Sequence, residues 1–116
     1  MEEKTYILPD WYNFKTIDEF KDCMSRGGEV GFIWKGKQYF VCSNRDGDEN
    51  SPMRTYIGEA YYIKDGKCYN IESHEEVNFE ESDRDYDTSD EALEYIVGGD
   101  RLRDVITQVE VVERTL

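Results

Sequence analysis

Histidine, proline and cysteine are scarce in this chain, and their scarcity excludes several kinds of site. The 116 residues include one histidine, two prolines and three cysteines. Because the number of cysteines is odd and none stand in a C-x-x-C pair, a disulfide framework and a zinc-ligand pattern are excluded. We therefore expect reduced thiols in a reducing compartment.

Long apolar runs are missing as well. The N-terminal segment MEEKTYILPDWY opens with acids and contains no apolar core of the kind that signal peptides have. No stretch reaches the roughly 18 apolar residues that a membrane span needs. The sequence therefore predicts a cytoplasmic protein.

Signatures of catalysis are absent from the sequence. It contains no glycine-rich phosphate loop, no dinucleotide-binding glycines, no zinc-protease helix and no serine-hydrolase elbow. The single histidine, His74, stands among carboxylates and is expected on the surface. We predict no catalytic residue, no metal site and no cofactor, and hence a protein that is not an enzyme. A hydrolase that uses clustered carboxylates with a divalent ion is an alternative.

Positive charge is also scarce, and the negative charge is concentrated in one segment. The chain has 14 basic and 27 acidic residues, for a net charge of -13 at pH 7, which opposes direct binding to nucleic acid or anionic membranes. Between Glu72 and Glu94 lie eleven carboxylates and one basic residue, Arg84. This window carries -10, and the remaining 16 acids and 13 bases leave only -3.

Composition and capping signals predict one folded domain over residues 1–116. Aromatic residues make up 14% of the chain, which disordered chains lack. We expect an N-terminal arm or strand over 1–15 and a helix over 16–27. Thr16 and Glu19 form a capping box at its start, and Gly27-Gly28 ends it.

Two β-hairpins are expected over residues 29–72. Their two-residue turns are Lys35-Gly36 and Asp65-Gly66, and the second is a preferred type I′ pair. These turns set the cross-strand neighbours, which gather apolar side chains on one face of each hairpin. The predicted pairs are Phe32–Tyr39, Val30–Val41, Tyr62–Tyr69 and Ala60–Ile71.

The C-terminal half is expected to contain an acidic connector over 73–88 and helices over 89–109. Val77 and Phe79 alternate with polar residues and suit a short edge strand. Gly98-Gly99 breaks the helical pattern, with Thr88 and Asp100 as caps. The predicted fold is α+β: an antiparallel four- to five-stranded β-meander packed with an N-terminal helix and one broken or two short C-terminal helices.

The acidic segment is the candidate partner-binding site. Asp83, Asp85 and Asp87 alternate, so an extended chain projects them to one side about 6.6 Å apart, and such a surface resembles the phosphates of a few DNA base pairs. It suits the basic groove of a nucleic-acid-binding protein, possibly a nuclease, with Tyr86 placed to stack like a base. A solvated loop that only keeps the protein soluble is the alternative. The predicted partner-binding residues are Glu75, Glu76, Glu80, Glu81, Asp83, Asp85, Tyr86, Asp87, Asp90 and Glu91.

The tyrosines offer a different interaction surface. Tyr56, Tyr61, Tyr62 and Tyr69 cannot all lie in the core, and tyrosine-rich patches are common at protein interfaces. A scaffold or homodimer joined through a tyrosine-rich sheet face is therefore an alternative function.

Three stretches of the chain carry a resemblance to a group of known proteins. TIDEFKDCMSRGGEVGFIWKGKQYFV, then YIGEAYYIKDGKCYNI, and later DEALEYIVGGDRLRDVI resemble small acidic proteins of unknown function in Firmicutes prophages and mobile elements. The likeness covers roughly residues 16–109 and is structural, so it implies no site residue. It implies a phage-encoded protein, and small acidic phage proteins often inhibit host nucleases, as anti-CRISPR proteins and other DNA mimics do.

Overall fold

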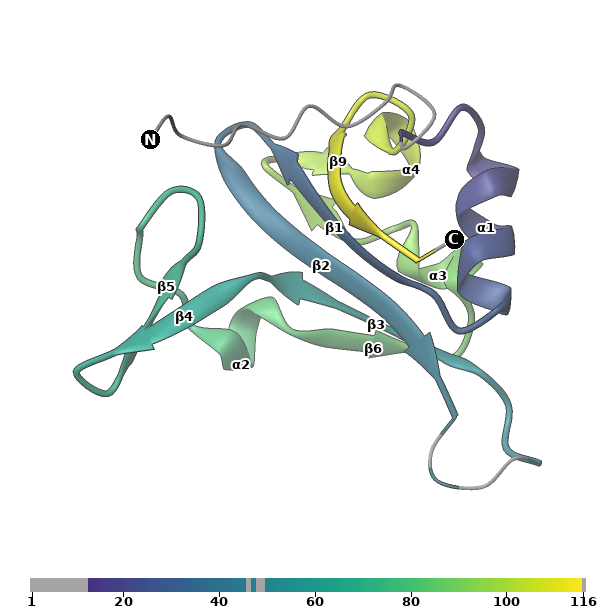
Figure 1. Cartoon of the computed structure of the whole chain (residues 1–116), viewed down its shortest axis with the longest axis horizontal. Coiled ribbons are helices and arrows are strands. Elements are labelled where there is room, and N and C mark those ends of the chain that lie inside the picture. Colours follow the sequence, from purple (N-terminus) through teal and green to yellow (C-terminus); the bar gives the residue numbers. More distant parts are fainter. Residues whose placement is uncertain (1–12, 46, 48–49, 116) are drawn as a thin grey trace, which may run out of the picture.

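A five-stranded antiparallel sheet forms the centre of an α+β fold (Figure 1). The computed structural model describes residues 13–45, 47 and 50–115, so residues 1–12 of the predicted arm over 1–15 lie outside the described residues. The strand order across the sheet is β6-β3-β2-β1-β9. The strands are β1 (Glu29–Trp34), β2 (Lys37–Asn44), β3 (Arg54–Glu59), β6 (Arg84–Tyr86) and β9 (Glu110–Arg114).

Short elements complete the chain around this sheet. Two small hairpins lie outside it, β4 (Tyr61–Lys64) with β5 (Lys67–Asn70) and β7 (Ile96–Val97) with β8 (Asp100–Arg101). The helices are α1 (Ile17–Ser25), α2 (Phe79–Ser82), α3 (Ser89–Ala92) and α4 (Leu102–Val105). No helix in the described part of the chain is long and apolar enough to cross a membrane.

The first hairpin has the predicted register and supplies the middle of the sheet. Phe32 lies opposite Tyr39 and Val30 opposite Val41. Lys35 and Gly36 both have positive φ, 52° and 80°, as a type I′ turn requires. The strands β1, β2 and β3 form a meander in which β3 takes the place predicted for the second hairpin, and β6 and β9 are added at its two edges.

Helix α1 also begins and ends as predicted. The Thr16 hydroxyl accepts a hydrogen bond from the Glu19 N–H at 3.1 Å. At the other end Gly27 has a φ of 77° and its N–H donates to the Met24 carbonyl, a glycine C-cap. The helix buries Phe20, Cys23 and Met24 against the sheet.

The two short C-terminal helices are present as α3 and α4, but they cover much less of the range 89–109 than predicted. Thr88 does cap a helix, but α3 ends after one turn, and Ile96 and Val97 belong to the hairpin β7–β8. Gly98-Gly99 forms the turn of that hairpin. Asp100 caps no helix; its carboxylate accepts a hydrogen bond from Trp34 Nε1 at 3.0 Å and pairs with Lys35 Nζ at 2.9 Å.

The hydrophobic core lies between one face of the sheet and the helices α1, α3 and α4. The apolar pattern of the C-terminal half was a correct guide to burial, because Leu102, Val105, Ile106 and Val109 are all in the core. Beyond α4 the chain forms β9, in which residues 110–114 pair with β1 and Val111 lies opposite Phe32. Strand β9 therefore closes one edge of the sheet.

The second hairpin keeps its predicted turn and register but leaves the sheet. Tyr62 lies opposite Tyr69, and Asp65-Gly66 have the positive φ of a type I′ turn. The chain from β3 turns away at Ala60, so β4 and β5 form a separate ribbon, which projects away from α1 and α4 in Figure 1. The expected edge strand at Val77 and Phe79 is wrong: Val77 is buried, Phe79 begins α2, and the edge strand is β6.

Candidate protein-binding surface

Strand β6 arranges part of the acidic segment as its alternation predicts. Asp83, Asp85 and Asp87 lie in and beside this strand, which pairs with β3. There Arg54 donates to Asp85 at 2.7 Å and also binds Asp87. These hydrogen bonds, above all the one that Arg54 donates to Asp85, raise the pKa of Arg54. The Arg54 guanidinium therefore offsets one of the three negative charges, those of Asp83, Asp85 and Asp87, that were predicted to face a partner.

A second group of the predicted acids is also paired within the molecule. Arg103 Nε lies 2.8 Å from Glu94, and its Nη2 lies 3.3 Å from Asp90. Lys21 and Arg101 add further contacts to these carboxylates, at 3.4 and 3.2 Å. The hydrogen bonds from Arg103 lower the pKa of both Asp90 and Glu94. Asp90 is thus occupied by internal cations.

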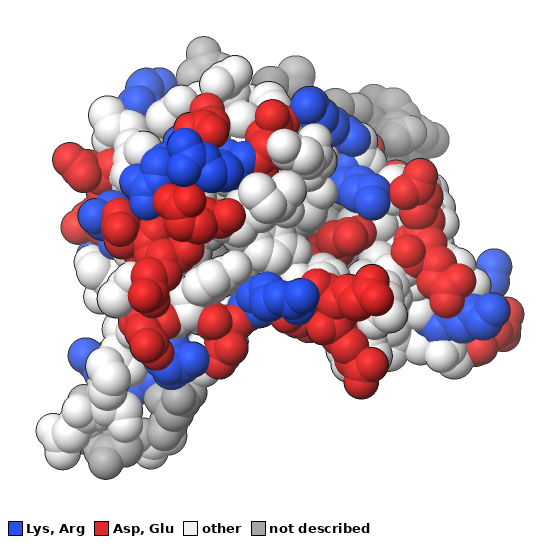
Figure 2. All heavy atoms as spheres, turned by 180° about the vertical axis from the view of Figure 1, so that it is seen from behind, with Lys and Arg blue, Asp and Glu red and all other residues white. Residues whose placement is uncertain are grey.

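Within the acidic segment, the carboxylates without an internal ion pair lie mostly around α2. In the described chain Glu72, Glu76, Glu80, Glu81 and Glu91 are exposed and form no ion pair, whereas Glu75 meets Lys37 at 3.5 Å. Seen from behind, acidic and basic side chains adjoin one another over much of the surface (Figure 2). The ten predicted partner-binding residues therefore do not form one uniform patch.

Exposed apolar side chains gather on the same part of the molecule. We call residues 61–82, which contain the β4–β5 ribbon and α2, the lobe. Of the five exposed large hydrophobic residues among the described ones, four belong to it: Tyr62, Ile63, Ile71 and Phe79. Ile63 is the most exposed, at 71%. The lobe thus combines apolar surface with unpaired carboxylates, a combination that sequence reasoning did not single out.

The predicted tyrosine-rich sheet face is not a single surface. Tyr61 stacks on Phe79 of α2, with ring centroids 6.4 Å apart, so this side of the ribbon is partly covered. Tyr62 and Tyr69 lie on the other side of the ribbon, 5.7 Å apart. Tyr56 lies in β3 of the main sheet. Self-association through these tyrosines stays a prediction.

Asn70 holds the lobe against the sheet, and sequence reasoning missed it. Its side chain is fully buried. The amide oxygen accepts hydrogen bonds from the N–H groups of Gln38, Glu72 and Ser73, at 3.1, 2.9 and 3.1 Å. The amide nitrogen donates to the Gln38 carbonyl and to Glu59, both at 3.0 Å. Asparagine at the end of a strand is common at turns, so the sequence alone gives no sign of this role.

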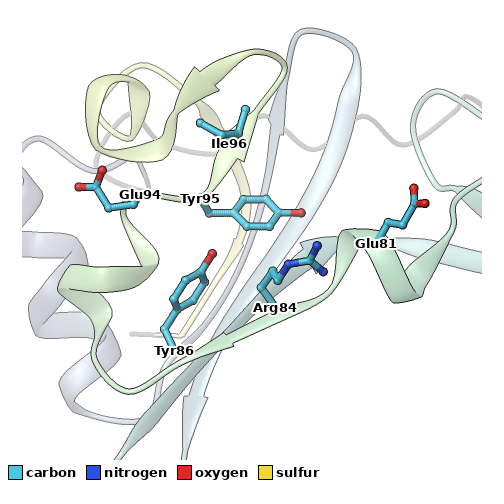
Figure 3. Close-up of a pocket in the computed structure, with 6 residues that line it drawn as sticks. All are labelled: Glu81, Arg84, Tyr86, Glu94, Tyr95 and Ile96. Carbon is cyan, nitrogen blue, oxygen red and sulfur yellow. The ribbon is translucent and has the colours of Figure 1, made fainter.

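A shallow pocket separates the lobe from the α3–β7 segment (Figure 3). Its volume is about 300 Å³, and it is lined by Glu81, Arg84, Tyr86, Glu94, Tyr95 and Ile96. Tyr95 donates from its hydroxyl to the Ser82 carbonyl at 2.6 Å, which links the two sides. Tyr86 is half-buried and packs against the core, so its ring lines this pocket. It does not project alone as a base-like stacking group.

The cysteines and the histidine do not form a nucleophilic site. Burial raises the pKa of the Cys23 and Cys42 thiols, which keeps them protonated at neutral pH. Cys23 is buried as a structural thiol, while Cys42 and Cys68 are half-buried. His74 is exposed, as predicted, and its Nδ1 lies 3.1 Å from the Tyr62 hydroxyl. Among the described residues no group of three or more His, Cys, Asp or Glu is placed to hold a metal ion.

Comparison with protein-family models, curated proteins and solved structures finds no match for this chain. The candidate surface is therefore described from its own geometry.

Proposed function

We propose that this protein is a non-enzymatic binding module that docks a basic protein partner through the lobe. The observation that carries the proposal is the coincidence of unpaired carboxylates and exposed apolar side chains on residues 61–82. Aromatic and apolar groups at the centre of an interface supply most of its binding energy, while charges at the rim steer the encounter. Glu76, Glu80 and Glu81 supply that rim here.

The class of partner follows from the sign of the charge. Carboxylates without internal cations favour a Lys- and Arg-rich surface, such as the groove in which a nucleic-acid-binding protein holds phosphates. Occupation of that groove excludes the nucleic acid, so the module acts as an inhibitor of DNA-mimic type. The resemblance to small acidic prophage proteins supports the same function. The binding surface is then centred on the lobe, because Asp85, Asp87 and Asp90 are already paired.

Charge reversal in the lobe tests this function. The variant Glu76→Lys/Glu80→Lys/Glu81→Lys alters three exposed carboxylates that form no ion pair in the described chain. The matched control is Glu29→Lys/Glu110→Lys/Glu113→Lys, whose exposed acids lie on β1 and β9 at the opposite edge of the sheet. Each protein is immobilised and used to capture partners from a lysate of cells that carry the gene, at about 50 and about 500 mM NaCl. Bound proteins are identified by mass spectrometry and challenged with duplex DNA.

We expect the parent and the control to retain the same basic nucleic-acid-binding protein at low salt. The lobe variant loses it, high salt releases it, and duplex DNA displaces it. Circular dichroism confirms that both variants keep the fold. If the lobe variant captures the same protein as the parent, the proposed function is wrong.

Self-association is a second candidate, and the exposure of Ile63 favours it. An isoleucine that is 71% exposed at the tip of a ribbon suits a contact between two copies. Light scattering of the parent and of Ile63→Glu decides the question: a dimer that this substitution dissolves supports self-association, and a monomeric parent at high concentration dismisses it.

A further inference from the structure

The side of the sheet that faces away from the helices carries a second cavity. Because side chains alternate along a strand, Val41 and Ile57 point into the core, and Phe40 and Tyr56 lie on the opposite face. This face has a cavity of about 330 Å³, lined by Phe40, Tyr56, Asp83, Arg84 and Asp85. It is distinct from the pocket of Figure 3, which lies on the helix side of β6.

Asp83 is the unusual member of this cavity. Its Oδ1 is buried and has no hydrogen-bond partner within the described residues. The carboxylate lies directly on Gly58, where a Cβ would overlap Oδ1, so only glycine allows this approach. Burial, reinforced by the nearby Glu59 and opposed by Arg84, raises the pKa of Asp83. The unsatisfied Oδ1 costs free energy, and because Asp83 as a residue is only half-buried, a cation that pairs with the rest of the carboxylate offsets that cost.

The neighbouring arginines form no ion pair with Asp83. Arg54 lies on the same face and binds Asp85 and Asp87. Arg84 lines both this cavity and the pocket of Figure 3, and its Nη1 donates to the backbone carbonyls of Glu80 and Asp83. In the described chain Asp83 is therefore a carboxylate without a cationic partner, in a cavity with aromatic walls.

We propose that this cavity receives an arginine side chain of the partner protein. The guanidinium pairs with the Asp83 carboxylate and lies against the rings of Phe40 and Tyr56, which attract cations through their faces. A planar guanidinium is favoured over an ammonium because it both stacks on rings and donates to a carboxylate from two nitrogens. The inference rests on the proposed function for the partner's identity alone; the cavity itself is tested with a small probe.

The probe is N-acetyl-arginine amide, and N-acetyl-citrulline amide is its neutral control of nearly equal shape. Binding is followed by two-dimensional NMR of the ¹⁵N-labelled full chain. We expect the arginine probe to shift the amide signals of Phe40, Tyr56 and Gly58 with a millimolar dissociation constant, and the citrulline probe to leave them unchanged. Lysine amide should bind at least threefold more weakly.

Three variants separate the cavity from the rest of the surface. Asp83→Asn should weaken arginine binding about tenfold, since the charge is lost while the shape is kept. Phe40→Leu should weaken it several-fold through the lost ring, and Glu81→Gln, in the other pocket, should not change it. Spectra without probe establish that each variant is folded.

The proposal is overturned if citrulline shifts the same signals as strongly, if lysine binds equally well, or if Asp83→Asn binds arginine as the parent does. These readouts do not involve a partner protein. The capture experiment can therefore contradict the proposed function while the arginine titration supports the cavity, and the reverse can also occur.

Discussion

Because Gly58 has no side chain, the carboxylate of Asp83 can lie against its backbone and become partly buried. The glycine sits in β3, and the carboxylate of the residue just before β6 comes to rest on its backbone. The buried oxygen accepts no hydrogen bond in the described part of the molecule. Groups that destabilise the fold in this way are frequent where a protein meets a ligand.

Replacement of Asp83 should therefore stabilise the protein, in a pH-dependent manner. The pKa of Asp83 is raised in the folded state, so between its unfolded and folded pKa the folded protein binds more protons, and the free energy of unfolding falls as pH rises through that window. Near pH 7 we expect Asp83→Asn to raise the free energy of unfolding by about 0.5–1 kcal/mol, or roughly 2–4 °C in Tm.

Thermal unfolding by circular dichroism, near pH 7 and near pH 3, checks this sign. At the acid pH both folded and unfolded Asp83 are largely protonated, and the difference from the parent should nearly vanish. A variant that is less stable than the parent at neutral pH contradicts the assignment of Asp83 as a destabilising carboxylate.

At the scale of elements, the side chain of Asn70 is a central link between the lobe and the sheet. The Asn70 side chain takes the part of a main-chain hydrogen-bond partner. It binds the N–H and the carbonyl of Gln38 near the start of β2 and the N–H of Glu72 in the turn after the ribbon. Its buried amide helps to fix the position of a ribbon of only two short strands, because an isolated hairpin is marginally stable in water.

Asn70→Ala should loosen the lobe more than it disturbs the core. The substitution leaves the N–H groups of Gln38, Glu72 and Ser73 without their acceptor. We therefore expect the free energy of unfolding to fall by about 2–4 kcal/mol. Hydrogen exchange measured by mass spectrometry should show faster exchange over residues 61–75 than in β1. The matched control is Asn78→Ala, which removes only the cap bond to the Glu80 N–H. Equal exchange rates in the lobes of both variants would contradict the role of Asn70.

The elements that sequence reasoning predicted well are those determined by neighbours along the chain. The Thr16 cap and the two glycine turns act within a few residues, and α1 and both hairpins follow from them. The helices in the segment 89–109 are shorter than predicted because the structure there depends on distant contacts: Asp100 is held by Trp34 and Lys35, and residues 110–114 pair with the edge of β1. Helical spacing still identified the buried residues, since burial follows apolarity in either structure.

The candidate site could be predicted only in part, for the same reason. The concentration of negative charge between Glu72 and Glu94 is visible in the sequence. Its internal pairing is not, because Arg54, Arg101 and Arg103 reach these carboxylates through folding. The exposure of Ile63 and Phe79 likewise depends on the β4–β5 ribbon lying outside the sheet, and no local sequence pattern predicts that position.

At the scale of the whole molecule, the net charge of -13 acts on a body that measures 46 × 35 × 29 Å. Like charges at these separations repel one another and oppose the compact state. The ion pairs of Arg54 and Arg103 offset part of this repulsion, but they are exposed, and exposed pairs contribute little to stability.

Added salt should therefore stabilise this fold. From about 20 to about 500 mM NaCl the Debye length falls from roughly 20 to 4 Å, which removes more repulsion than attraction in a molecule of this net charge. We expect Tm to rise in scanning calorimetry, and to rise less in Glu76→Lys/Glu80→Lys/Glu81→Lys, whose net charge is six units less negative. A fall in Tm with salt would show that the internal ion pairs dominate.

Strand β9 has a consequence for how the protein is made. It pairs with β1, although some eighty residues separate Val30 from its neighbour Arg114. During synthesis the meander emerges first, with the β1 edge unoccupied, and the sheet reaches its final width only when residues 110–114 appear. Until then that edge is open to chaperones and to other nascent chains. Completion of this sheet thus waits for the synthesis of residues 110–114, and ribosomes stalled before that point would hold an unfinished sheet.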